Sequence, residues 1–251
     1  MRGRCTRAAC ASLLIGALAG CSAPVGPDGR PVVDPHEAGN RSIFGFNEGV
    51  DYYVLNPLAE GWSTITFLDL RLSLNKFFYN LEFLVRCLSN LGQGEGKQAG
   101  VEVVRFLTNT TVGLLGFFDP ASRLGLQRSD EDFGQMFAVW GMDGDPYWVL
   151  PFLGPSNPRD TLGFVFDSIF DLMLVFGLPI EIVNTRALRD REIEAARRSA
   201  LDFYVFVRDA YLQRREAQVQ NRKLREELDD ETQGPGDDFY ELEENDSESV
   251  P

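Results

Sequence analysis

The chain has 251 residues, with 38 acidic and 24 basic side chains and a formal net charge of −14 at pH 7. This length allows one sizeable core without a second domain, and the acidic balance argues against binding to nucleic acid, which relies on clustered Lys and Arg. His36 is the only histidine, and no Cys, His or carboxylate cluster has zinc spacing, so we expect neither an enzyme nor a bound metal or cofactor.

The first twenty residues have the parts of a bacterial secretion signal. A basic start over residues 1–7 precedes an apolar run over residues 8–19, which is too short to span a bilayer permanently. The run ends in Leu18-Ala19-Gly20-Cys21, which resembles a lipobox, and an ordinary signal peptide with a nearby Cys is the alternative. We expect residues 1–20 to be removed and Cys21 to be lipidated. By analogy with lipoprotein sorting, Ser22 in place of Asp favours a lipid-anchored position on the periplasmic side of the outer membrane.

Both ends of the mature chain are expected to lack a fold. Residues 21–38, which are rich in Pro and Gly, predict a lipidated flexible tether. Residues 226–251 hold 12 Asp or Glu and no Lys or Arg, and residues 229–251 predict a disordered acidic tail. The tail serves either solvation or docking to a periplasmic partner.

Residues 39–228 predict one all-α domain, because their apolar side chains recur at helical spacing and no convincing strand pattern is present. The expected helices differ in polarity: the middle ones are apolar on most sides, and the last is long and charged. The sequence predicts a helix from residue 40 that ends at Asn56-Pro57, where Pro57 starts another, and then one helix over 69–91. A short helix capped by Thr110 or Thr111 ends at Phe118, and a further helix is capped by Ser129 or Asp130. An apolar helix over 159–179, a short helix over 180–188 and a charged helix to about residue 228, with Leu201 on its buried face, complete the prediction.

Two groups of side chains stand out as candidate functional residues. Tyr147, Trp148 and Phe152 lie in a Gly/Pro-rich loop, where they either sit at a membrane interface or pack back on the core. Asp160, Asp167 and Asp171 interrupt an apolar segment at offsets of seven and four, which places all three on one helical face. Apolar helices with a narrow acidic stripe suit either a lipid path with a polar lane or a compact core with solvated faces.

Several segments, in order over residues 38–215, resemble the VacJ/MlaA family of outer-membrane lipoproteins. The chain departs from the family pattern at Gly39, at Phe83 and in its long acidic tail. The segments that carry the resemblance are Asn40-Arg41 with Phe44, Phe46 and Asn47; Asp51–Leu55 with Pro57; Asn80-Leu81; Arg105-Phe106 with Asn109-Thr110-Thr111 and Gly113; Gly116 with Asp119; Phe133-Gly134; Leu150-Pro151; Gly154–Ser156; Arg159-Asp160; and Arg208 with Ala210-Tyr211.

The resemblance implies a ring-like bundle of amphipathic helices in the inner leaflet of the outer membrane. Its central channel would remove phospholipids misplaced in the outer leaflet, pass them to a soluble periplasmic carrier and so maintain lipid asymmetry, with a trimeric porin as partner and no cofactor. On this hypothesis Asp160, Asp167 and Asp171 line the polar lane, and Arg159 either meets headgroup phosphate or pairs with Asp160. The alternative is a structural lipoprotein that tethers envelope components through its charged C-terminal helix.

Overall fold

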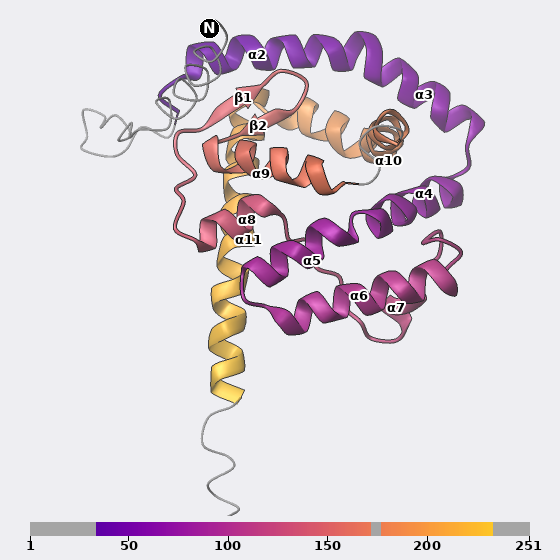
Figure 1. Ribbon diagram of the computed structural model, residues 1–251. Helices are drawn as coiled ribbons and strands as arrows, with labels where there is room; N and C mark the ends of the chain where they lie inside the picture. The colour runs from indigo at the N-terminus through magenta and orange to yellow at the C-terminus, as the bar shows by residue number, and fades with distance from the viewer. Residues whose placement is uncertain (1–33, 172–176, 233–251) are drawn as a thin grey trace, which may run out of the picture.

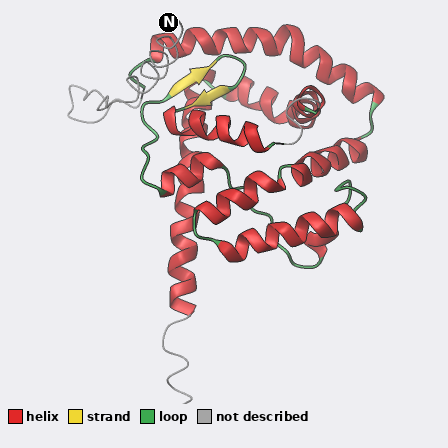
Figure 2. Ribbon diagram, in the orientation of Figure 1, coloured by secondary structure: helices red, strands yellow, loops and turns green. Residues whose placement is uncertain are grey.

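The computed structural model describes residues 34–171 and 177–232. The expected secretion signal, the expected lipidation site Cys21 and the chain beyond residue 232 therefore lie outside the described residues. The described part is almost entirely helical, with one small hairpin (Figure 2). The all-α prediction is confirmed, and the hairpin is an addition to it.

The fold begins earlier than the sequence predicted. Helix α2 (Glu37–Val50) starts two residues before the expected boundary at residue 39. Asp34 is buried, and its carboxylate accepts hydrogen bonds from the side-chain amide of Asn40 at 2.8 Å and from the Tyr204 hydroxyl. Residues 34–38 thus belong to the folded domain and not to a flexible tether, because a buried carboxylate fixes them to the last helix.

One long curved arm opens the domain (Figure 1). It consists of α2, a π-helical turn (Asp51–Leu55) and α3 (Asn56–Ile65). The predicted new helix at Asn56-Pro57 is confirmed, since α3 begins at Asn56 with Pro57 in its first turn, but the π turn accommodates the proline and the arm continues without an interruption. There the N–H of Asn56 donates to the Asp51 carbonyl, which opens the hydrogen-bond ladder just where the ring of Pro57 would meet the carbonyl four residues before it.

The predicted single helix over 69–91 is two helices, α4 (Leu68–Leu81) and α5 (Phe83–Gly92). They break at Glu82, which leaves the helical region with φ −75° and ψ 4°. No Gly or Pro marks this point in the sequence. The break turns α5 so that Arg86, Ser89 and Asn90 are buried against the helix that follows, and places Glu82 at the corner.

Helix α6 (Gly96–Thr111) runs back along α5, and α7 (Pro120–Arg123) follows an irregular turn (Figure 1). The predicted helix capped by Thr110 or Thr111 and ending at Phe118 is wrong. Asn109 stays inside α6 because its buried amide donates to Asp119 at 3.1 Å and accepts the N–H of Ala121 at 3.1 Å. These two bonds hold the connection between α6 and α7 in place of a helix.

Asp132, and not Ser129 or Asp130, caps α8 (Phe133–Val139), through the N–H of Gln135 at 2.8 Å. Ser129 is held elsewhere, because its N–H donates to the Glu102 carboxylate at 3.1 Å. Strands β1 (Trp148–Leu150) and β2 (Gly154–Ser156) then form an antiparallel hairpin in which Trp148 pairs with Ser156. Each strand has only three residues, too few for an alternating pattern.

Three helices complete the domain: α9 (Pro158–Phe170), α10 (Leu178–Ser199) and α11 (Phe203–Thr232). The expected break near residue 188 lies instead at Ala200–Asp202, where Asp202 accepts the N–H of Val205 at 3.2 Å. Leu201, expected on a buried face, is fully exposed at this corner. Helix α11 runs down past the other helices (Figure 1) and includes residues 229–232, which the sequence assigned to the tail.

The elements close into a ring. Contacts lead from α2 to α3, then through α10, α4, α5 and α8 to α11, and return through β2 and β1 to α2. Helix α9 packs on α8 and α5 inside this circuit, and α6 with α7 forms an outer layer against α5 and α4 (Figure 1). The predicted ring-like bundle is therefore confirmed.

Polar side chains make up much of the interior of this domain and large apolar side chains lie on its surface, the reverse of a typical soluble protein. The buried apolar side chains form two small clusters, one around Phe133 and Phe137 and one around Tyr147 and Tyr204. The buried residues also include many polar ones, among them several Arg, while large apolar side chains cover the outside. Exposed apolar patches of this extent mark contact with a partner or a membrane. Among the described residues, none of the helices has both the length and the apolar character needed to cross a membrane.

Candidate functional site: a polar passage through the helical ring

A polar cavity of about 670 Å³ occupies the middle of the ring, lined by α4, α5, α9, α10, α11 and the hairpin. A second cavity of about 540 Å³ adjoins it on the side of α10. The two share Glu82, Phe164, Asp167, Asp171 and Arg189 as lining, so they meet at these residues. We call the two cavities together the polar passage.

Asp160 joins two helices, α9 and α11, at the wall of the larger cavity. It lies in the first turn of α9, where Asn157 caps the helix by accepting the N–H of Asp160 at 2.8 Å. Its carboxylate accepts Nε and Nη2 of Arg215 at 2.7 and 2.9 Å and the hydroxyl of Tyr211 at 2.5 Å. Burial opposes ionisation, but the hydrogen bonds from Arg215 hold the pKa of Asp160 at about 2. This carboxylate is therefore committed to joining α9 to α11.

Asp167 lies two turns further along α9 and lines both cavities. It accepts the backbone N–H of Phe133, at the start of α8, at 3.1 Å. Gly163 permits this approach, because a Cβ there would lie 2.4 Å from the backbone nitrogen of Gly134. Burial and the nearby charge of Asp132 raise the pKa of Asp167 to about 7, although the Phe133 N–H opposes the shift.

Three further carboxylates gather where the cavities meet. Asp171 ends α9 and lines both cavities, as does Glu82 at the corner between α4 and α5. Glu181 lines the smaller cavity from α10. Burial and the charge of Glu181 raise the pKa of Glu82 to about 7, and burial and the charge of Asp171 raise the pKa of Glu181. We call Glu82, Asp167, Asp171 and Glu181 the acidic throat.

Cations line the larger cavity beside the acidic throat. The guanidinium carbons of Arg86 and Arg128 lie 3.6 and 4.6 Å from the centroid of the Tyr79 ring, a cation–π arrangement. Tyr79 donates its hydroxyl hydrogen to the Ser129 carbonyl at 2.9 Å, which fixes the ring between α4 and the loop before α8. All three side chains line the cavity.

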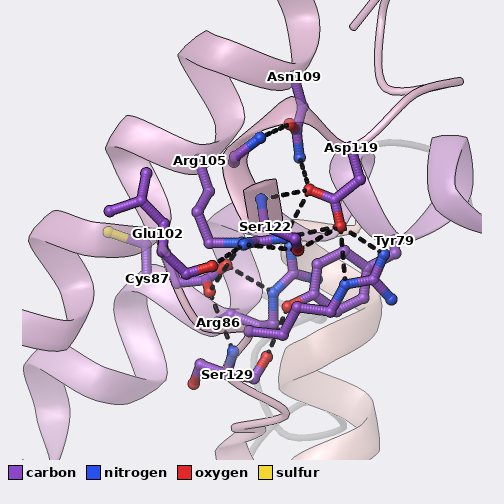
Figure 3. A network of polar contacts seen from close by, with 12 residues as sticks. Tyr79, Arg86, Cys87, Glu102, Arg105, Asn109, Asp119, Ser122 and Ser129 are labelled. Carbon is purple, nitrogen blue, oxygen red and sulfur yellow. Dashed lines mark hydrogen bonds and ion pairs between the residues drawn. The ribbon is translucent and has the colours of Figure 1, made fainter. Parts of the chain in front are cut away.

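A buried polar network supports this wall from behind (Figure 3). Glu102, fully buried on α6, accepts Arg86 Nε at 2.8 Å and the N–H of Ser129 at 3.1 Å. Arg105, one turn on, donates to both oxygens of Asp119 at 3.1 and 3.2 Å. The network joins α5, α6, α7 and the loop before α8, so it holds Arg86 at the cavity wall while satisfying charges that burial would otherwise destabilise.

The three aspartates predicted to line a polar lane do line the same cavity, but the arginine predicted to accompany them does not. Asp160, Asp167 and Asp171 all line the polar passage. Arg159 is buried, and its Nε donates to Asp160 at 2.9 Å, so it adopts the pairing geometry. Its guanidinium packs against Gly144 and does not line either cavity.

The three aromatic residues proposed for a membrane interface have different surroundings. Tyr147 is only 1% exposed and packs on Tyr204 and Val149, so its assignment to an interface is wrong. Trp148 is half-buried, and its indole N–H donates to Thr161 at 3.0 Å. Phe152, at the hairpin turn, is 74% exposed, and its role at an interface stays a prediction.

Sequence reasoning missed the partners of these carboxylates. Arg215 is one of many charges on the long last helix and carried no signal of its own, yet it lies at the centre of the contacts among α8, α9 and α11. Glu82 and Glu181 carried no sequence signal, because only the corner after α4 and the path of α10 bring them to the passage. Arg105 and Asp119 did carry one, as members of the motifs quoted above. In the part of the chain that the structure describes, no His, Cys, Asp or Glu group is suited to holding a metal ion.

Comparison with known proteins places these features in a family. The family model described as MlaA lipoprotein matches residues 32–218. The intermembrane phospholipid transport system lipoprotein MlaA of Escherichia coli K12 is 30% identical over 236 residues, covering 90% of this chain and 93% of the relative. The protein of the same name from Haemophilus influenzae is 34% identical over 203 residues, covering 76% and 81%.

Another relative and a solved structure match a similar share of the chain. An uncharacterised protein of Rickettsia bellii is 32% identical over 203 residues, covering 77% of this chain and 80% of its own. A chain solved in work on the structural basis for maintenance of bacterial outer membrane lipid asymmetry superposes with a TM-score of 0.65 at 28% identity. It covers 74% of this chain and 98% of its own length, so nearly the whole of that solved structure has a counterpart here.

Proposed function

The chain belongs to the MlaA lipoprotein family, and from this premise we propose that it carries mislocalised phospholipid from the outer leaflet of the outer membrane through its polar passage. The passage delivers the lipid to a soluble periplasmic carrier and so maintains lipid asymmetry. The observation that carries this proposal is the inverted polarity: apolar side chains cover the outside, and charged side chains line a cavity within.

The energetics of lipid movement explain why both surfaces are needed. Bringing a phospholipid into water exposes its acyl chains at roughly 0.8 kcal/mol per CH₂, on the order of 20 kcal/mol in all. An apolar exterior keeps the protein within the leaflet, next to the acyl chains. The polar passage replaces water around the headgroup, whose charge is otherwise costly to bring into a bilayer. The protein therefore needs no catalytic group, and we propose that it acts as a transport component and not as an enzyme.

The remaining assignments rest on the family and the sequence. We propose lipidation of Cys21 as the anchor on the periplasmic side, a helical channel domain over residues 39–228 preceded by the residues that pack with it, and a trimeric porin as membrane partner. Asp160, Asp167 and Asp171 line the lane for the headgroup. Arg159 acts from behind this wall by positioning Asp160, because it does not line the cavity.

The test is the amount of phospholipid in the outer leaflet of cells that lack this protein and are complemented with variants. Replacing Asp167 and Asp171 with Leu removes two charges from the point where the cavities meet, so we expect this variant to leave outer-leaflet phospholipid as high as in the deletion strain. Glu192→Leu is the matched control, because Glu192 is exposed on α10 and lines neither cavity. A folded double variant with normal asymmetry would contradict the proposal.

One observation favours the second candidate, a tether between envelope components. Helix α11 extends beyond the rest of the domain (Figure 1) and carries a charged sequence. A truncation that tests this must spare Arg215, because Arg215 holds α8 and α9. Removing residues 221–251 should leave lipid asymmetry largely intact if the passage is the functional element, and should abolish function if the tether is.

A further inference from the structure

The acidic throat and the cations beside it differ in which cavity they line. Glu82, Asp167 and Asp171 line both cavities, and Glu181 lines the smaller one. Arg86 and Arg128 line only the larger cavity. The larger cavity also has carboxylates of its own, but they stand beside several guanidinium groups, whereas the smaller cavity has, of the described residues, only Arg186 and Arg189 as cations. A headgroup that moves from the larger to the smaller cavity therefore leaves the guanidinium groups of Arg86 and Arg128 behind.

On the basis of the proposed function, we propose that this arrangement selects phospholipids whose headgroup carries an ammonium group next to its phosphate, and disfavours headgroups with a net negative charge. The phosphate binds at the Arg86 side of the larger cavity. The ammonium group faces the acidic throat. The substrate class is thus a zwitterionic phospholipid such as a phosphatidylethanolamine.

The first support is an arginine with unused hydrogen-bonding capacity. The side chain of Arg86 is only 5% exposed, and it lines the larger cavity. Its Nε is bound to Glu102, but its Nη1 makes no hydrogen bond. A buried guanidinium N–H without an acceptor is costly, and a phosphate oxygen is the acceptor that guanidinium groups bind most strongly.

The second support is the spacing of opposite charges. Arg86 Nη1 lies 3.5 Å from Glu82 Oε2, too far for a hydrogen bond but close enough for the charges to interact. Cation and carboxylate thus lie side by side at the cavity wall, and this carboxylate is itself part of the acidic throat. A headgroup with phosphate and ammonium separated by two carbons likewise carries opposite charges on neighbouring groups, so it is complementary in sign to this pair.

The third support is the electrostatic state of the throat. The carboxyl groups of Glu82, Asp167 and Glu181 all have raised pKa values, because each is partly buried near at least one other acid. The one hydrogen bond shown to Asp167 comes from a backbone N–H, which carries no full charge. Carboxylates that destabilise one another are stabilised by an arriving ammonium group, whereas a headgroup that has only its phosphate is repelled.

The main cation of the smaller cavity does not offset these acids. Arg186 donates to both oxygens of Asp51 at 2.8 and 3.2 Å and to Asp190 at 2.7 Å, so its charge is already neutralised. Arg189 is the other cation there, against four carboxylates. Headgroups with net negative charge therefore meet an unfavourable field in the smaller cavity.

The test identifies the lipid inside the passage by photo-crosslinking. The full lipidated chain, with Phe164→p-benzoylphenylalanine, is reconstituted into vesicles of equal phosphatidylethanolamine and phosphatidylglycerol, irradiated, and the attached lipid is identified by mass spectrometry. Phe164 lines both cavities. Ile169→p-benzoylphenylalanine is the matched control, because Ile169 is exposed on the same helix and lines neither cavity.

We expect phosphatidylethanolamine to exceed phosphatidylglycerol roughly fivefold at position 164, equivalent to about 1 kcal/mol, and the bulk ratio at position 169. Adding Glu82→Gln and Asp167→Asn should bring the ratio at 164 to the bulk value. An equal or phosphatidylglycerol-rich ratio at 164 without these changes would overturn the selectivity and leave the proposed function standing. No lipid at 164, with normal labelling at 169, would overturn both.

Discussion

Replacing Arg215 with Met should destabilise the domain more than any nearby surface substitution. Arg215 is 13% exposed and makes four hydrogen bonds of 2.6–2.9 Å to Asp132 and Asp160, which belong to the N-termini of α8 and α9. Met fills a similar length but takes both Arg215 hydrogen bonds from Asp160, itself 9% exposed, and leaves it with Arg159 as its only cation among the described residues. Removing one partner of a buried ion pair costs about 3 kcal/mol or more.

The magnitude translates into a measurable melting shift. For a domain of this size about 1 kcal/mol corresponds to roughly 2–4 °C, so we expect Arg215→Met to lower Tm by roughly 6–12 °C in detergent micelles, followed by circular dichroism. Arg214→Met is the control, because Arg214 is exposed and makes no hydrogen bond or ion pair among the described residues, and its Tm should change by less than about 2 °C.

The pH dependence of the Tm difference shows whether the lost stability comes from the ion pair with Asp160. The pKa of Asp160 is held at about 2 in the folded state, below its ordinary value near 4, so its stabilising contribution is present above pH 4 and is lost as the pH falls through that window. The Tm difference between the parent and Arg215→Met should therefore shrink between pH 5 and pH 2.5. Equal shifts for Arg214→Met and Arg215→Met, or a difference that is constant with pH, would refute the reasoning.

Three further predictions concern the supports of the passage, each measured as Tm in micelles. Glu102→Gln should cost about 3 kcal/mol, because Arg86 loses its buried counter-charge while Arg105 keeps Asp119, and a loss below about 1 kcal/mol would contradict this. Asn157→Ala removes the cap of α9 and should cost about 1–2 kcal/mol, whereas Asn157→Ser should recover part of the loss. Asp167→Asn should be more stable than the parent by on the order of 1 kcal/mol at pH 8, with the gain fading towards pH 4. Between about pH 4 and pH 7 the unfolded carboxyl of Asp167 is ionised while the folded one, with its pKa raised to about 7, keeps its proton, so the parent loses stability as the pH rises. A gain independent of pH would be inconsistent with this.

The sequence predicted the helical class and the shared face of the aspartates because both depend on periodicity, which is local. Asp160, Asp167 and Asp171 fall on one face of any regular helix, and α9 is regular up to Phe170. The resemblance added the ring, whose closure depends on contacts between α2 and β1 and between α11 and β2 that no local pattern contains.

The errors occurred where a distant contact decides the local backbone. Asn109 looked like a helix boundary, but its amide is used by Asp119 and Ala121, so α6 continues past it. Glu82 ends α4 without a Gly or Pro. Tyr147 had the composition of an interface residue, yet it is buried against α11. In each case the partner is supplied by another element, which spacing within one segment cannot reveal.

The proposed function requires that the outer surface of the helical ring contacts lipid and that the polar passage inside it is hydrated. Nitroxide labels placed singly in a Cys87→Ala background test this directly in bilayers: Leu114→Cys and Ile169→Cys lie on the exposed apolar surface, and Thr185→Cys and Gln218→Cys line the cavities. The first two labels should be accessible to oxygen and protected from a water-soluble nickel complex, and the last two should show the reverse. Outer labels in contact with water, or inner labels that reach neither reagent, would contradict the central claim.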